Sequence, residues 1–121
     1  MDSFTNKPFK RNDRVGDEIR HILGNIFITD IFIPEAGLLT VTQVKVTEDL
    51  KLAKVFVSFL ENKIPKKDLL TILKEKKQHI RHLVSEKLAL KYTPQFRFFY
   101  DDTLEQAEHI DNLIEKIHKD D

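Results

Sequence analysis

Apolar and polar residues alternate over two neighbouring stretches of this chain, 44–47 and 52–60. Successive side chains of a strand point to opposite faces, so each stretch is predicted to be a strand with one apolar side. The residues between them, 48–51, include no glycine, which favours a loop built on a type I turn. The pattern predicts an antiparallel hairpin whose first strand begins near Leu38. The apolar side of its second strand is Ala53, Val55, Val57 and Phe59, and the other side is Lys54, Phe56 and Ser58.

Before the hairpin, apolar residues recur at the spacing of a helix. Asn12 or Asp13 is a suitable N-cap, whereas Gly16 and Gly24 weaken the helix. The apolar run that follows stops at Pro34, and a loop over 35–37 leads to the hairpin. The buried stripe of this first helix is predicted to be Val15, Ile19, Ile22, Leu23 and Ile26.

After Leu60 the spacing of apolar residues changes from two to about 3.6 residues. Pro65 suits the first turn of a second helix, whose apolar face comes from 69–73. That face lapses over 74–79. The alternatives are one continuous long helix and a bend or break near 76–78, and we expect the break because a straight helix would direct a lysine toward the core. A third helix follows, before 92–94 end the helical region. Its apolar residues are Ile80, Leu83, Val84, Leu88 and Leu90.

Residues 95–100 form a short aromatic stretch that is expected to join the sheet as a third strand. We expect its aromatic residues to be mainly core rather than a platform for base stacking, with Phe56 and Phe99 as exceptions if they are exposed. An acidic amphipathic helix is predicted over 102–121. The order α-β-β-α-α-β predicts an α+β fold, a three-stranded sheet with helices packed on one face.

With 121 residues the chain is expected to form one domain. No apolar run is long enough to span a bilayer, and the start of the chain lacks the apolar stretch of a signal peptide. The sequence has no cysteine, which excludes disulfides and thiol chemistry. We therefore expect a cytoplasmic protein, with a flexible basic arm over 1–11.

The net charge of zero hides an asymmetry along the chain. Residues 1–100 carry 18 Lys and Arg against 12 Asp and Glu, a balance of +6, and residues 101–121 carry 2 against 8, a balance of −6. Within the basic part, 62–91 alone has 9 against 3, again +6. Such a stretch is either a solvated helical face or a surface for a polyanion.

Catalytic and metal-binding patterns are weak. His79 and His82 have a spacing that could share a metal, but the third ligand would be Glu75 or Glu86, in the most cationic part of the chain. The serines lie in no nucleophile elbow, and the three glycines are too scattered for a phosphate loop. We predict no enzyme, no cofactor, no metal and no small-molecule substrate. A metal-dependent enzyme would need metal bound after purification.

An RNA backbone is the polyanion that we favour, because the basic residues cluster where the apolar stripe fails and the N-terminal arm can add charge. The alternative is a protein-interaction module that binds a basic partner through the sheet or the acidic helix. The predicted RNA contacts position the backbone and read no bases. They are Lys10, Arg11, Arg14, Arg20, Lys76, Lys77, Arg81 and Lys87.

The α-β-β-α-α-β order with a basic junction between helices resembles a type II KH domain, an RNA-binding scaffold. The residues of 44–50 and 53–60, then Ile80-Arg81, Pro94, Phe96, Phe98 and Tyr100-Asp101, are similar to the ribosome-binding factor A family. That family has a kink with a small residue and a glycine, and 76–78 has neither.

The resemblance extends over about 11–117 and implies a division into the arm, a KH-like RNA-binding domain over 12–101 and the acidic helix. It also implies that the protein binds the small (30S) ribosomal subunit and its 16S rRNA. It implies that the protein takes part in ribosome biogenesis without catalysing a reaction. The protein would assist late maturation of that subunit, including rRNA processing at the 5′ end, and would be important for cold adaptation. We expect a monomer.

Overall fold

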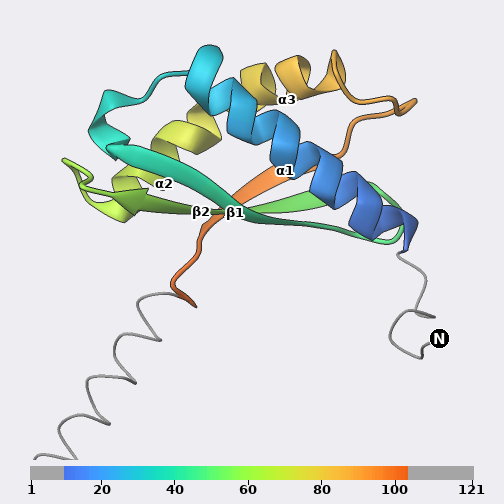
Figure 1. Cartoon of the computed structure of the whole chain (residues 1–121), viewed down its shortest axis with the longest axis horizontal. Helices are drawn as coiled ribbons and strands as arrows, with labels where there is room; N and C mark the ends of the chain where they lie inside the picture. Colours follow the sequence, from blue (N-terminus) through green and yellow to red (C-terminus); the bar gives the residue numbers. More distant parts are fainter. Residues whose placement is uncertain (1–9, 104–121) are drawn as a thin grey trace, which may run out of the picture.

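The computed structural model describes residues 10–103, which form a three-stranded mixed sheet with helices covering one face (Figure 1). The predicted α+β class and element order are confirmed. No helix in this part of the chain has the length and apolar character to cross a membrane. The predicted helix over 102–121 lies outside the described residues, except for its first two. The elements are α1 Arg11–Thr29, the short 3-10 helix η1 Pro34–Ala36, β1 Leu38–Val46, β2 Leu52–Leu60, α2 Lys66–Glu75, α3 Lys77–Ser85 and β3 Gln95–Tyr100.

Strand β2 lies in the middle of the sheet, antiparallel to β1 and parallel to β3. The predicted hairpin is confirmed, and its turn is closed by the backbone N–H of Leu50, which donates to the carbonyl of Thr47 at 2.9 Å. The register shifts between Val41 and Gln43, so β1 carries a bulge. A bulge adds one residue to a strand, which lets apolar residues on both sides of it face the helices.

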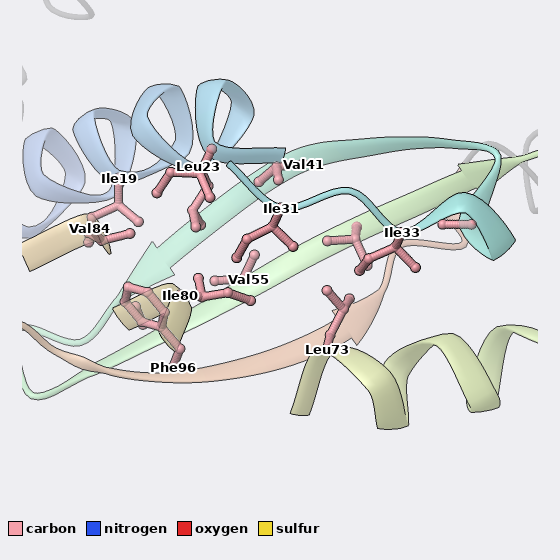
Figure 2. Close-up of a cluster of buried hydrophobic side chains, with 14 of the residues drawn as sticks. Ile19, Leu23, Ile31, Ile33, Val41, Val55, Leu73, Ile80, Val84 and Phe96 are labelled. Atoms are coloured by element: carbon pink, nitrogen blue, oxygen red, sulfur yellow. The ribbon is translucent and has the colours of Figure 1, made fainter. Parts of the chain in front are cut away.

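The core lies between the helices and one face of the sheet (Figure 2). Ala53, Val55 and Val57 of β2 have no exposed surface, and Phe96 of β3 is 1% exposed. Burying a large aliphatic or aromatic side chain contributes about 1.5–3 kcal/mol, which fixes the face on which the helices pack. Within residues 10–103 no polar or charged residue is buried.

Helix α1 begins at Arg11, slightly earlier than predicted, and Lys10 rather than Asn12 or Asp13 is its N-cap residue. The amide of Asn12 has another use, because its Nδ2 donates to the carbonyl of Val46 at 2.9 Å. This hydrogen bond ties the start of α1 to the end of β1, so the N-cap prediction was wrong. The buried stripe was right for Val15, Ile19, Leu23 and Ile26, and Ile22 is half-buried.

The predicted break between the second and third helices is confirmed at Lys76, where φ is −88° and ψ is 2°. A helical residue has ψ near about −42°, so one altered backbone angle turns the chain and leaves Lys76 exposed. Helix α3 ends at Ser85, earlier than predicted. Leu88 is nevertheless buried, because the connection to β3 folds back onto the core.

The side chain of Arg81 on α3 holds the chain that leads into β3. Its Nε donates to the carbonyl of Pro94 at 3.1 Å, and its Nη2 donates to the carbonyl of Thr93 at 2.6 Å. A planar guanidinium can make two such bonds at once, whereas an ammonium group acts as a point charge. Arg81 therefore fixes the approach of β3 to β2.

Replacing Arg81 by lysine keeps the charge and removes the two-pronged contact. We expect Arg81→Lys to lower the free energy of unfolding by about 1–3 kcal/mol, since carbonyls in a half-buried position lose their donors. Urea denaturation followed by circular dichroism measures this difference. The control is Lys76→Ala at the exposed junction, which should stay within about 0.5 kcal/mol. Equal stability of Arg81→Lys and the unaltered protein would contradict the role.

The two glycines of α1 have opposite surroundings. A Cβ added at Gly16 would lie 2.6 Å from the carbonyl oxygen of Val44, so α1 approaches the backbone of β1 too closely for any side chain. A Cβ added at Gly24 would have no heavy atom within 4 Å. Gly16 is therefore required by packing, and Gly24 is not.

These surroundings predict stability changes of opposite sign. Gly16→Ala should lower the free energy of unfolding by about 1–3 kcal/mol, because β1 must move away from the helix. Gly24→Ala should raise it by about 0.5–1 kcal/mol, because alanine favours helix and restricts the unfolded chain. Thermal and urea unfolding of the two variants provide the comparison, and a stabilising Gly16→Ala would show that α1 packs differently.

Candidate nucleic-acid interface

A hollow of about 330 Å³ lies between the two helices α2 and α3 and the edge strand β3. We call it the β3 groove. Its lining combines the cations Lys74, Lys77 and Arg97 with apolar side chains of α2 and β3. Within residues 10–103 none of these three cations forms a salt bridge. Positive charge beside apolar and aromatic surface is the combination that binds single-stranded nucleic acid.

Two further hollows, of about 390 and 450 Å³, continue the basic surface beyond the groove. They share residues 91–93, and the first includes Gln78, the neighbour of Lys77 in α3. The three hollows together form what we call the basic belt. Its cations are Arg11, Lys51, Lys74, Lys77, Arg81, Lys91 and Arg97.

The lining of the belt includes one carboxylate, that of Asp49. The hydroxyl of Thr47 donates to Asp49, as does the backbone N–H of Lys51, and these bonds lower the pKa of the carboxyl group. Asp49 thus remains ionised in the hairpin turn and serves the turn. The belt keeps a large excess of positive charge.

The opposite edge of the sheet has a different charge. A hollow of about 910 Å³ beside β1 is lined by Asp13, Asp17 and Asp101 together with Arg20 and Lys45. Asp101 accepts hydrogen bonds from the hydroxyls of Thr103 and Thr42, which hold the pKa of its carboxyl group below the usual value. Mixed charge at this edge makes it a poor surface for a polyanion.

The structure brings four of the eight predicted RNA contacts together. Arg11, Lys77 and Arg81 line the belt, and Lys76 precedes Lys77 at the junction of α2 and α3. The guanidinium of Arg81 is already bonded to backbone carbonyls, so its main role here is to support β3.

The other four predicted contacts lie outside the belt. Lys10 is 3.4 Å from Glu48, Arg20 is 3.8 Å from Asp17, and Lys87 is 4.0 Å from Asp30. Arg14 is exposed on α1 and lines none of the three hollows. The eight residues therefore do not form one surface.

Sequence reasoning missed Lys51 and Arg97 and counted Lys74 and Lys91 only as part of a general basic stretch. The alternation in 95–100 could have placed Arg97 on the face opposite Phe96 and Phe98. Its closeness to Lys74 and Lys77 depends on β3 being an edge strand next to α2, which periodicity cannot give.

His79 and His82, whose spacing could share a metal, gather no further ligands within residues 10–103. Within residues 10–103 no group of three or more His, Cys, Asp or Glu side chains could hold a metal ion. His82 instead lies 3.7 Å from Glu86, one helical turn away.

Comparison with known proteins gives the family. The family model "Ribosome-binding factor A" matches residues 11–114. A ribosome-binding factor A from Clostridium botulinum (strain Eklund 17B) is 38% identical over 112 residues, which cover 91% of this chain and 97% of that protein. The one from Halothermothrix orenii is 33% identical over 108 residues, covering 89% and 88%.

Solved structures of the same kind share the fold. The crystal structure of ribosome-binding factor A from Thermus thermophilus has a TM-score of 0.65 at 17% identity, covering 74% of this chain and 94% of that one. A homology model of the Thermus thermophilus protein, fitted into a cryo-EM map of its complex with 30S, has a TM-score of 0.61 at 16% identity, covering 71% and 90%. With its α-β-β-α-α-β fold and its family match, the chain belongs to the ribosome-binding factor A family.

Proposed function

We propose that this chain is a non-enzymatic assembly factor that binds the immature small ribosomal subunit through its 16S rRNA. The observation that carries the proposal is the β3 groove, whose three cations have no salt-bridge partner among residues 10–103, in a chain of the ribosome-binding factor A family. A related protein from Thermus thermophilus was fitted into a map of a 30S complex, which supports the same target here.

The chemistry of the belt supports contact with the RNA backbone. Lys and Arg side chains neutralise phosphates and release bound counterions, so such binding weakens as salt is added. Lys74, Lys77 and Arg97 are the phosphate contacts in the groove, and Lys76 and Arg11 extend them along the belt. These contacts position the protein without reading the sequence.

The role in rRNA processing depends on the stage of subunit maturation at which the protein binds. Contact with 16S rRNA late in maturation would assist processing of the 5′ end, and loss of the protein would slow growth most in the cold. The RNA-binding unit is then the body over 12–101. The protein acts as a cytoplasmic monomer and leaves the mature subunit.

A triple substitution in the groove tests the proposal. Lys74→Ala, Lys77→Ala and Arg97→Ala together should weaken binding to immature 30S subunits about 10- to 100-fold. The slope of the logarithm of the binding constant against the logarithm of the salt concentration should fall by the amount expected for about two to three lost phosphate contacts. Co-sedimentation with 30S subunits over a range of salt concentrations measures both effects.

The matched control removes the same charge elsewhere. Lys10→Ala, Arg20→Ala and Lys87→Ala take away three cations that each face a carboxylate outside the belt. Binding of this control should change only a few-fold. If the groove variant sediments as the unaltered protein does, or if both triple variants lose binding equally, the groove is not the RNA-binding site.

A further inference from the structure

The sheet face opposite the helices has no covering element within residues 10–103 (Figure 1). We call it the open face. Phe56 of β2 and Phe99 of β3 stack on each other there, with ring centroids 5.5 Å apart and an interplanar angle of 28°. Neither ring belongs to the core, and Phe99 is 39% exposed. This stacked pair, which we call the aromatic platform, leaves Phe99 exposed on the open face.

A row of cations crosses the sheet next to this platform. Lys45, Lys54 and Arg97 are direct partners across β1, β2 and β3. Like charges directly opposite one another on a sheet repel, so the row is unfavourable without a counter-charge. Within residues 10–103 no carboxylate forms a salt bridge with any of the three.

Two groups, the Phe56 ring and the carboxylate of Asp101, lie near Lys45 at one end of the row. Lys45 Nζ lies 5.5 Å from the centroid of the Phe56 ring, so charge and aromatic surface are in contact. Asp101 shares a hollow with Lys45, and besides the hydrogen bonds from Thr103 and Thr42 the charge of Lys45 lowers the pKa of its carboxyl group. Lys45 thus has a nearby counter-charge, whereas Lys54 and Arg97 form no salt bridge within residues 10–103.

The open face is continuous with the β3 groove. Arg97 and Phe99 line the groove, and the same two residues stand in the cation row and the aromatic platform. A strand of RNA that follows the belt around the edge of β3 would reach the platform without a break in positive charge.

We propose that the open face is a second RNA-binding surface, on which an unpaired base of single-stranded RNA stacks on the exposed Phe99 ring and extends the Phe56–Phe99 pair, while Lys54 and Arg97 bind the adjoining phosphates. The proposal rests on the proposed function, because it extends the same RNA path. Stacking of this kind tolerates any sequence, since every base has an aromatic face. The platform adds affinity for bases, and the groove adds affinity for phosphates.

A tryptophan placed in the platform reports stacking directly, because the chain contains no tryptophan of its own. The emission of Phe99→Trp should be quenched when a short single-stranded oligoadenylate is added to the full-length chain. The control is Phe32→Trp, at an 80% exposed position before η1 and away from the sheet strands. Its emission should not change. Unchanged emission of Phe99→Trp would overturn the proposal.

A second comparison separates the platform from the groove. Phe56→Ser with Phe99→Ser should weaken binding of oligoadenylate about ten-fold and leave binding of an abasic oligomer of the same length unchanged. Lys74→Ala with Lys77→Ala should weaken both, because that variant removes phosphate contacts only.

The pattern of results tells the two proposals apart. If the serine variant weakens both oligomers equally, the rings do not contact bases and the platform proposal fails, whatever the groove variant does. If the groove variant has no effect while the serine variant acts on oligoadenylate alone, the platform stands and the groove proposal fails. If a protein binds to the open face and the emission of Phe99→Trp does not change when RNA is added, the open face belongs to a protein partner and the RNA proposal fails.

Discussion

The structure depends on the two unlike faces of the central strand β2. Ala53, Val55 and Val57 are fully buried on one face, and every helix of the described chain packs over that side. Lys54 and Phe56 are held on the other face by the same alternation, because neighbouring strand residues must point in opposite directions. Packing the apolar face thus determines which charged and aromatic groups remain available for a partner.

The parallel pairing of β3 with β2 positions the basic belt. Parallel neighbours cannot be joined by a tight turn and need a crossover, which α2, α3 and their flanking loops supply. The crossover returns the chain to the edge of the sheet, where Lys74 and Lys77 of the helices share a hollow with Arg97 of β3. Arg81 secures the last step of this return through the carbonyls of Thr93 and Pro94.

Charge on this protein is organised by edges of the sheet rather than by its total. The chain is neutral overall, yet the β3 edge is cationic and the β1 edge combines three aspartates with Arg20 and Lys45. A polyanion responds to the local potential within about 10 Å, so a neutral protein can still bind RNA at one edge. Paired cations such as Lys10 and Lys87 add little to that potential, because a carboxylate lies beside each.

The sequence by itself determined the elements, their order and the covered face, because these follow from periodicities of two and about 3.6 residues and from burial of apolar side chains. It also located a break near 76–78, since a straight helix would bury lysine, and the structure places it at Lys76. Helix ends and caps did not follow from the pattern, because Asn12 bonds to β1 instead of capping α1. Which cations form one surface was decided only by tertiary structure. Arg97 meets Lys74 and Lys77 because β3 pairs in parallel at the edge of the sheet, and strand pairing is a long-range choice that local patterns leave open.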